Sequence, residues 1–225
     1  MGGGGFSEEP DNLLLDKYFF FLSGKKTPKV CFIGTASGDA QSYIDKFYDN
    51  MKKHQVEASH LSLFKPPLGS LRDFVFAKDV IYVGGGNTRN LVVLWKEWGL
   101  DKILRQAYRA GLVIGGISAG SLCWYEQGVT DSVTGELNPL TCLGLLKGSN
   151  CPHYDVEVKR RPVYQRLILK GMKPGIACDN SVAAVFENDK FKEFVSSVPT
   201  ANGYFVGKVG KKIVETLVKP RYLGG

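Results

Sequence analysis

The sequence predicts an α/β protein whose core is a mainly parallel sheet covered by helices on both faces. In the first half of the 225-residue chain, short apolar runs alternate with segments of helical periodicity. Three of these runs end in clusters of small residues, at 34–38, 84–88 and 116–120. Beyond residue 175, short β-rich runs separated by turn residues indicate antiparallel ribbons at the end of the sheet. Because parallel sheets bind ligands beyond the carboxyl ends of their strands, the three clusters mark the expected site.

The helices and strands of the first half follow from periodicity. Apolar residues at helical spacing predict helices at 13–22, 40–54, 71–77, 88–95 and 100–110. Apolar or alternating runs predict strands at 30–33, 58–64, 80–83 and 112–114. The glycine run at 2–5 would join the same sheet edge if a short or trimmed first strand precedes it.

The second half is expected to be less regular. Residues 129–154 carry aspartate, glycine, asparagine and proline without clear periodicity and are predicted to form a loop. A helix is predicted at 161–171, and strands are predicted at 175–179, 181–186, 191–195, 204–209 and 212–218. There are no internal repeats. A chain with 44% apolar residues can bury one sizeable core, so a single domain spanning residues 1–225 is expected.

Composition favours a cytoplasmic protein without a membrane anchor. No run of about twenty apolar residues exists, so no transmembrane helix is expected. The first residues lack the basic and apolar regions of a secretory signal. The five cysteines are an odd number without C-x-x-C spacing. Cys31 and Cys178 lie in apolar runs, where a reduced buried thiol is the ordinary interpretation.

The formal net charge of +7 does not by itself indicate a nucleic-acid partner. The basic residues are spread along the chain, and no zinc finger, recognition helix or aromatic-basic repeat accompanies them. A solvated basic face is the preferred interpretation, and attraction of acidic small substrates stays open.

Residues 112–124, L-V-I-G-G-I-S-A-G-S-L-C-W, join an apolar strand to a helix start through a tight turn that contains Ser118. In such a turn the serine hydroxyl projects at the carboxyl edge of the sheet, and the amide of Ala119 lies at the helix N-terminus. Gly116 and Gly120 supply the absence of a side chain that a strained turn needs. The pattern alone leaves two interpretations, a catalytic nucleophile or an ordinary tight turn.

A serine nucleophile needs a base, and the chain offers three histidines. His54 ends a charged helix and is predicted to be a solvated surface residue. His60 alternates with apolar residues in a strand, where packing is favoured over catalysis. His153 lies in the sequence C-P-H-Y, a loop held by proline, and is the best candidate base.

The third member should be a carboxylate that orients the imidazole, and three aspartates are candidates. Asp155 is two residues from His153, which points the two side chains awkwardly for contact with Nδ1. Asp131 would give the chain order Ser, Asp, His, as in α/β-hydrolases. Asp179 follows an apolar strand and could reach over the same sheet edge as Ser118. The residues alone do not choose between Asp131 and Asp179.

Residues 84–87 are expected to supply the second half of an oxyanion site. The glycine amides of this strand-to-helix turn, which ends at Asn87, can approach a bound carbonyl closely. Together with the amide of Ala119 they would provide two donors. A phosphate-binding turn is the alternative, but G-G-G-N-T is neither G-x-G-x-x-G nor a P-loop.

Three motifs, in this order and spacing, together resemble peptidase E: V-G-G-G-N-T at 83–88, G-I-S-A-G at 116–120 and P-H-Y at 152–154. Peptidase E enzymes are cytoplasmic serine peptidases that remove an N-terminal aspartate from dipeptides, and the cyanophycinases are their relatives. The resemblance covers most of the chain, to about residue 186. It implies a three-layer α/β/α sandwich similar to class I glutamine amidotransferases, with a Ser-His-acid triad. No metal or other cofactor is expected, and the chain has no H-E-x-x-H motif.

The resemblance assigns roles residue by residue. Ser118 matches the nucleophile and His153 the base, while Gly86 and Ala119 match the two oxyanion amides. The family's acid lies beyond the helix after the histidine, just past an apolar strand, and Asp179 falls there. Residues expected to support the site or the substrate are Gly85, Asn87, Val163 and Asp131, the last of which matches an aspartate of the family.

The substrate-binding side departs from peptidase E at Val163. In that family an arginine, two residues before a Gln-Arg pair in the helix after the histidine, reads the substrate's aspartate. The pair here is at 165–166, so Val163 stands at the matching position, and Arg160 and Arg161 are near but not at it. A valine-lined pocket would favour a neutral or apolar N-terminal side chain, because a buried unpaired carboxylate is costly.

The leading hypothesis is a serine exopeptidase, a dipeptidase or aminopeptidase, that acts on short peptides. One alternative is a cyanophycinase-like hydrolase of branched aspartyl-arginine polymers, which would need an acidic pocket. The other is a non-catalytic amidotransferase-like binding protein, against which the intact set of Ser118, His153 and Asp179 argues. The expected partners are short peptides, with no nucleic acid and no membrane, and the chain is expected to be a monomer or homodimer.

Overall fold

The computed structural model describes residues 1–65, 69–133 and 135–225. Its first sheet contains four strands in the order β2-β1-β3-β4. These strands are β1 (Lys29–Ile33), β2 (Glu57–Leu61), β3 (Val80–Val83) and β4 (Val113–Gly116). All of their pairings are parallel, so the carboxyl ends of the four strands lie at one edge.

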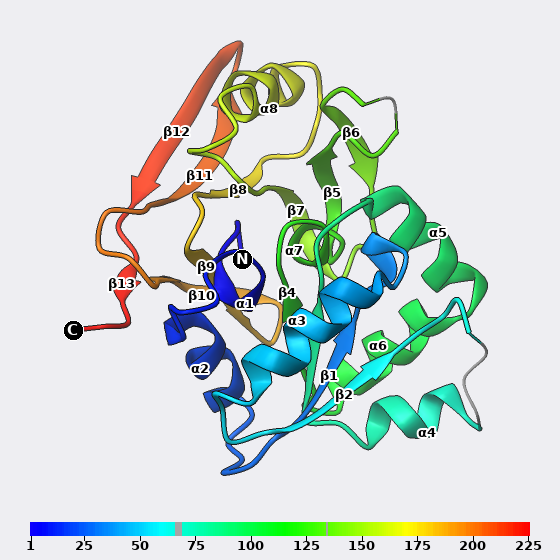
Figure 1. Cartoon of the computed structure of the whole chain (residues 1–225). Coiled ribbons are helices and arrows are strands. Elements are labelled where there is room, and N and C mark those ends of the chain that lie inside the picture. The colour runs from blue at the N-terminus through cyan, green and yellow to red at the C-terminus, as the bar shows by residue number, and fades with distance from the viewer. Residues whose placement is uncertain (66–68, 134) are drawn as a thin grey trace.

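Helices cover both faces of this sheet (Figure 1). One face carries α4 (Leu71–Phe76), α5 (Thr88–Glu97) and α6 (Leu100–Arg109), and the other carries α1 (Gly5–Glu8), α2 (Leu14–Phe21) and α3 (Gln41–Met51). Because side chains alternate along a strand, β3 sends Ile81 and Val83 to the first face and Val80 and Tyr82 to the second. This arrangement confirms the predicted layers. None of the helices in the described part of the chain is long and apolar enough to span a bilayer.

The second sheet has six strands in the order β12-β11-β8-β7-β5-β6. They are β5 (Tyr125–Thr130), β6 (Asn138–Thr141), β7 (Leu146–Cys151), β8 (Gly175–Cys178), β11 (Gly203–Val209) and β12 (Lys212–Val218). Of its four inner strands, β5, β7 and β8 are parallel to one another, and β11 is antiparallel to β8. The helix α8 (Arg160–Leu169) packs against this sheet through the buried Tyr164 and Ile168.

A small third sheet and the β11–β12 ribbon complete the C-terminal part (Figure 1). The third sheet contains β9 (Val182–Glu187), β10 (Lys190–Ser196) and β13 (Arg221–Tyr222). The pairs β9–β10 and β11–β12 are antiparallel, as predicted for this region.

The prediction of a loop over residues 129–154 was wrong, because this stretch holds the end of β5 and all of β6 and β7. The reason is that β7 buries polar side chains. Ser149 bonds the hydroxyl of Tyr164 at 2.7 Å, and Asn150 donates to the hydroxyl of Ser121 at 3.0 Å. A strand whose buried positions are polar and hydrogen-bonded shows no hydrophobic alternation in its sequence.

The N-terminal segment (residues 1–4) lies at the centre of the molecule, between the end of β4 and the start of β9 (Figure 1). The carbonyl of Met1 accepts a hydrogen bond from the amide of Ser118 at 3.2 Å. The amide of Gly2 donates to the carbonyl of the first residue of β9 at 2.8 Å. The segment therefore connects the edge of the first sheet, where Ser118 lies, to the third sheet.

Candidate functional site

Ser118 occupies the turn between β4 and the short helix α7 (Ala119–Leu122). Its backbone has φ 53° and ψ −110°, a conformation that costs a residue with a side chain about 1–3 kcal/mol. Gly116 and Gly120 let this turn press against β3, since a Cβ on them would lie 2.1 and 2.2 Å from the carbonyl oxygen of Val83. A strained strand-to-helix turn of this kind presents a serine hydroxyl at the edge of the sheet.

The turn after β3 leaves one backbone amide without a partner. The amides at positions 84, 85, 87 and 88 donate to the carbonyls of Ile33 and Ala36 and to the hydroxyls of Tyr43 and Ser132. The amide of Gly86 makes no hydrogen bond within the described residues, and the residue is exposed. Its φ is 132° and a Cβ would lie 2.3 Å from the carbonyl oxygen of Ala36, so the turn requires glycine here.

A second free donor lies beside the serine. The amide of Ala119, at the first position of α7, likewise has no hydrogen-bond partner in the described part of the chain. The two turns are in contact, because a Cβ on Gly85 would lie 3.4 Å from Cβ of Ser118. The turn that carries the free amide of Gly86 therefore lies against the turn that carries Ser118 and the free amide of Ala119, the arrangement expected of an oxyanion site.

His153 follows β7 with a φ of 54°, and its side chain is buried. Its Nδ1 lies 2.8 Å from Oδ1 of Asn180, within hydrogen-bond distance. Its Nε2 makes no hydrogen bond to the residues that the structure describes. This nitrogen is therefore available for proton transfer.

The N-terminal segment connects Ser118 to His153, although no hydrogen bond joins their side chains within the described residues. Met1 holds the amide of Ser118, and two residues later Gly3 packs against Asn180, the partner of His153. In active sites of this kind the hydrogen bond between nucleophile and base is often long until substrate binds.

Asp179, the predicted orienting acid, has another partner. Its Oδ2 accepts from the amide of Asn202 at 2.9 Å, and its own amide donates to the carbonyl of Asn202 at 3.1 Å. Burial raises the pKa of this carboxyl group. No hydrogen bond joins Asp179 to His153 in the described residues, and the side chain at Nδ1 is that of Asn180. Successive residues past the end of a strand point in different directions, so one position decides which of them reaches the imidazole.

Asn180, which contacts Nδ1 of His153, is a residue that reasoning from the sequence did not consider. The search for a third member considered carboxylates alone, whereas an amide oxygen also accepts a hydrogen bond from Nδ1. The signal was present as D-N-S after β8, where a second acceptor follows the aspartate at the strand end.

Asp131 and Asn87 lie at the same edge, in adjoining turns. Asp131 follows β5 and is exposed. Its neighbour Ser132 accepts from the amide of Thr88 at 2.8 Å and, through its carbonyl, from Nδ2 of Asn87 at 3.3 Å. Asn87 also caps α5, because its Oδ1 accepts from the amide of Asn90 at 2.9 Å. Asn87 therefore holds the turn after β3 in place.

Val163 lies on α8, partly buried against the core beneath the helix. The two arginines that precede it on α8 are both paired. Arg160 is 5% exposed and donates from Nε to the carboxylate of Glu157 at 2.8 Å. Arg161 pairs with Glu215. Neither guanidinium is therefore an unpaired cation facing a substrate.

The other two histidines lie around α3. His54 is half-buried, contrary to the prediction of a solvated residue, with its ring centroid 5.1 Å from that of Phe20. Burial lowers the pKa of His54 to about 4. Nδ1 of His60 bonds the hydroxyl of Tyr48 at 2.9 Å. Both residues pack against helix side chains, and His153 is the histidine at the sheet edge.

The cysteines do not offer a competing nucleophile. All five are free and buried, as predicted for Cys31 and Cys178. Burial raises the pKa of four of these thiols to about 12, those of Cys31, Cys142, Cys151 and Cys178, and that of Cys123 is raised as well. Such thiols carry almost no thiolate at neutral pH.

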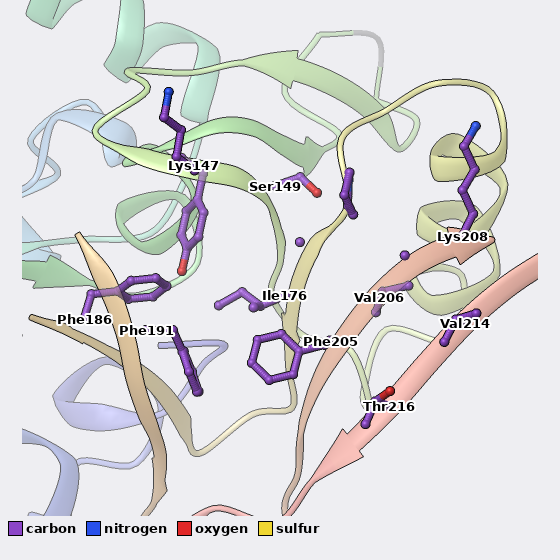
Figure 2. Close-up of a pocket in the computed structure, with 14 residues that line it drawn as sticks. Lys147, Ser149, Ile176, Phe186, Phe191, Phe205, Val206, Lys208, Val214 and Thr216 are labelled. Atoms are coloured by element: carbon purple, nitrogen blue, oxygen red, sulfur yellow. The ribbon is translucent and has the colours of Figure 1, made fainter. Parts of the chain in front are cut away.

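A groove of about 480 Å³ lies apart from these residues, on the second sheet (Figure 2). Phe186, Phe191 and Phe205 form much of its surface, and Lys147 and Lys208 extend at its sides. Neither the serine, the histidine nor the free amides line it. The chemistry suggested by the site therefore does not use this groove.

The sequence matches the model of peptidase family S51 over residues 1–194. It is 54% identical over 225 residues to the uncharacterized peptidase YgaJ of Bacillus subtilis, covering 100% of this chain and 97% of that protein. It is 27% identical over 143 residues to the uncharacterized peptidase Lmo0363 of Listeria monocytogenes, covering 60% of this chain and 70% of that protein.

Two solved structures share the fold. A crystal structure of a peptidase from an acI-B1 actinobacterium has a TM-score of 0.71 at 14% identity, covering 97% of this chain and 94% of that one. The crystal structure of a putative peptidase E protein from L. monocytogenes EGD-e has a TM-score of 0.56 at 19% identity, covering 90% and 93%. At these identities the similarity supports only a shared fold.

Proposed function

The chain belongs to peptidase family S51 and is a serine-type peptidase, and from this premise we propose that it is a cytoplasmic exopeptidase acting on short peptides. In this proposal it releases the N-terminal residue of a dipeptide or a slightly longer peptide. Ser118 is the nucleophile, His153 is the general base and acid, and the amides of Gly86 and Ala119 form the oxyanion hole.

In the first half of the proposed reaction, Oγ of Ser118 attacks the scissile carbonyl carbon while Nε2 of His153 takes the hydroxyl proton. The carbonyl oxygen becomes an oxyanion and accepts hydrogen bonds from the amides of Gly86 and Ala119. The carbon–nitrogen bond then breaks as His153 returns the proton to the leaving amine.

In the second half, water attacks the resulting ester of Ser118. His153 again takes a proton, now from the water, and returns it to Oγ as the ester bond breaks. The products are a free carboxylic acid and the regenerated serine. Ser118, His153 and the two amides therefore serve both halves of the reaction.

The observation that carries this proposal is the pair of unpartnered amides beside Ser118. Every other amide of the turn after β3 is bonded, and the residue that keeps its donor free is the one whose backbone only glycine can adopt. A free backbone donor in a tight turn is unusual, because most main-chain donors find partners. Two such donors beside a serine in a strained conformation support acyl transfer.

For specificity we propose a neutral or apolar N-terminal residue rather than strict aspartate. The position that carries the aspartate-reading arginine in peptidase E is Val163. Arg160 and Arg161 are held by Glu157 and Glu215, and Arg166, one turn further along α8, is exposed to solvent. A substrate carboxylate placed there would be desolvated without a partner.

The test is a panel of dipeptides and tripeptides, read by mass spectrometry, that compares Asp-Leu with Leu-, Met-, Ala- and Arg-initiated peptides. We expect cleavage of the neutral peptides and a loss of at least about 10³-fold in Ser118→Ala, as for removal of a serine nucleophile. Full activity in Ser118→Ala would exclude the mechanism. Cleavage confined to Asp-Leu would keep the mechanism and refute the proposed specificity.

A further inference from the structure

We propose that Asn180 positions the imidazole of His153, and that the carboxylate of Glu8 fixes Asn180 in turn. The inference rests on the proposed role of His153 as the base of a serine peptidase. It replaces the carboxylate of a Ser-His-Asp triad by an amide with a carboxylate behind it. In this arrangement Asn180 and Glu8 are positioning residues, because neither touches the reacting atoms.

Three hydrogen bonds hold Asn180 in place. Its Oδ1 lies 2.8 Å from Nδ1 of His153. Its Nδ2 donates to Oε2 of Glu8 at 2.9 Å, and its backbone amide donates to Oδ1 of Asp155 at 2.8 Å. Both ends of the side chain and the backbone beneath it are therefore engaged.

The contact with Glu8 determines which way round the amide of Asn180 lies. A carboxylate only accepts hydrogen bonds, so the NH₂ group faces Glu8 and the oxygen faces the imidazole. That oxygen also only accepts, so His153 carries its proton on Nδ1. This tautomer leaves the lone pair on Nε2, where a base for Ser118 needs it.

The N-terminal segment makes room for this chain of contacts. A Cβ on Gly3 would lie 2.4 Å from Oδ1 of Asn180 and 2.6 Å from Oε2 of Glu8. The amide of Gly4 donates to the same Oε2 at 3.1 Å, which holds the carboxylate next to the segment. The glycine run therefore supplies both the space and an extra donor for the group that fixes Asn180.

Replacing a carboxylate by an amide changes the charge that the imidazolium meets during catalysis. In a Ser-His-Asp triad a full negative charge contacts Nδ1 and stabilises the imidazolium. Here Asn180 offers a dipole, and the charge of Glu8 lies one side chain further away and is exposed to solvent. Tautomer selection is therefore the main contribution of Asn180, with charge stabilisation a smaller one.

The first experiment reads the tautomer without any need for activity, by long-range ¹H–¹⁵N NMR of the imidazoles in the full chain. With only three histidines, the signals of His153 are assigned by their loss in His153→Gln. We expect the Nδ1–H tautomer in the wild type and in Asp179→Asn, and a mixture with Nε2–H in Asn180→Ala. Loss of the Nδ1–H tautomer in Asp179→Asn together with its retention in Asn180→Ala would overturn the proposal in favour of Asp179.

The second experiment follows kcat, KM and the pH profile on a peptide that the wild type cleaves. We expect Asn180→Ala to lower kcat roughly 10²-fold, within the range of general acid–base catalysis, with KM changed less than about threefold. In E8Q/N180D the amide and the carboxylate are interchanged and both hydrogen bonds persist. The double variant should recover kcat. It should also move the acid limb of the pH profile up by about one pH unit, because a carboxylate now contacts the imidazolium.

Two matched variants sharpen the comparison. Asn180→Asp alone places two carboxylates in contact, so it should recover less activity than E8Q/N180D. Glu9→Gln removes a neighbouring carboxylate that bonds Ser181 and Ser197 instead of Asn180, and it should retain the Nδ1–H tautomer. Wild-type kcat in Asn180→Ala would refute the proposal. If the wild type cleaved no peptide, the NMR result would still decide the role of Asn180, so failure of the proposed function stays distinguishable.

Discussion

At the scale of single residues, Gly86 shows how one backbone atom can be kept free for chemistry. Its neighbours in the turn use their amides to hold the turn against β1 and α3, while its own N–H stays exposed. A side chain would force the turn away from the carbonyl of Ala36, and the free amide would move with it. Glycine is therefore required at position 86 both for the conformation of the turn and for the position of the free N–H donor.

We predict that Gly86→Ala lowers kcat roughly 10²-fold, in the range for loss of one oxyanion donor, with a smaller change in KM. Displacement of the amide removes a hydrogen bond that strengthens only as the oxyanion forms. The measurement is steady-state kinetics on the best peptide of the panel, with the melting temperature recorded in parallel.

The matched control is Gly171→Ala. Gly171 also has a positive φ, of 110°, but a Cβ there would meet open space. Gly171→Ala should therefore carry the same kind of conformational penalty as Gly86→Ala but retain the kcat of the wild type. Equal kcat in the two variants would show that Gly86 does not hold the oxyanion.

At the scale of elements, α8 is the helix that we propose selects the substrate's N-terminal side chain. The helix packs on the second sheet through Tyr164 and Ile168. This packing sets the rotation of α8 about its axis and therefore the direction in which each of its other side chains points. Arg160 pairs with Glu157, which precedes the helix, and Arg161 pairs with Glu215 on β12. Val163, on the same helix, is apolar and partly buried against the core.

We predict that Val163→Arg raises cleavage of Asp-Leu relative to Leu-Leu by at least about tenfold, because a guanidinium pairs with a carboxylate in two parallel hydrogen bonds. Val163→Gln is the matched control, since it adds length and polarity without charge and should leave the ratio near that of the wild type. The ratio of kcat/KM values for the two peptides is the measurement. An unchanged ratio in Val163→Arg would mean that position 163 does not face the substrate's N-terminal side chain.

At the scale of the whole molecule, the site exists because several separate strands deliver their ends to one region. β3 brings the oxyanion turn, β4 the serine, β7 the histidine and β8 the asparagine. The N-terminal segment contacts the ends of β4 and β8, and a buried carboxyl group lies close to the residue that follows it. Asp16 is fully buried, accepts a hydrogen bond from the hydroxyl of Tyr82 at 2.8 Å and lies against Gly5.

Burial raises the pKa of Asp16 from its ordinary value of 3.8 to about 7, which makes stability depend on pH. Between these two values the folded chain binds a proton that the unfolded chain has lost. The free energy of unfolding therefore falls as pH rises, by at most about 1.4 kcal/mol per unit from this group, and levels off above pH 7. We predict that Asp16→Asn, which stays neutral and can still accept from Tyr82, removes this fall.

The measurement is urea unfolding at pH 5, 6, 7 and 8, followed by tryptophan fluorescence. The advantage of Asp16→Asn over the wild type should grow from pH 5 to pH 8. Asp45→Asn, an exposed carboxylate on α3, is the control and should keep a constant difference from the wild type. Parallel curves for Asp16→Asn would show that Asp16 is ionised in the folded protein.

The sequence by itself determined the fold class, most elements and the two central residues of the proposed site. Strands β1 and β3 and helices α2 and α6 form within a residue or two of their predicted places, because each carries its own periodicity. The turns around Ser118 and Gly86 were visible because a tight turn selects small residues locally. The strand at 146–151 was missed because its buried side chains include polar ones that are hydrogen-bonded to residues elsewhere in the chain.

Only the tertiary structure decided which side chain contacts Nδ1 of His153. Asp179 and Asn180 are adjacent in sequence, and both carry an oxygen that can accept from an imidazole. Which of them faces His153 depends on the register of β8 against β7 and on the packing of Gly3 against Asn180. The partner of Asn180, Glu8, is separated from it by 172 positions. A local sequence pattern determines whether a segment forms a helix, a strand or a turn. The directions of neighbouring side chains are set by contacts between segments that are distant in the chain.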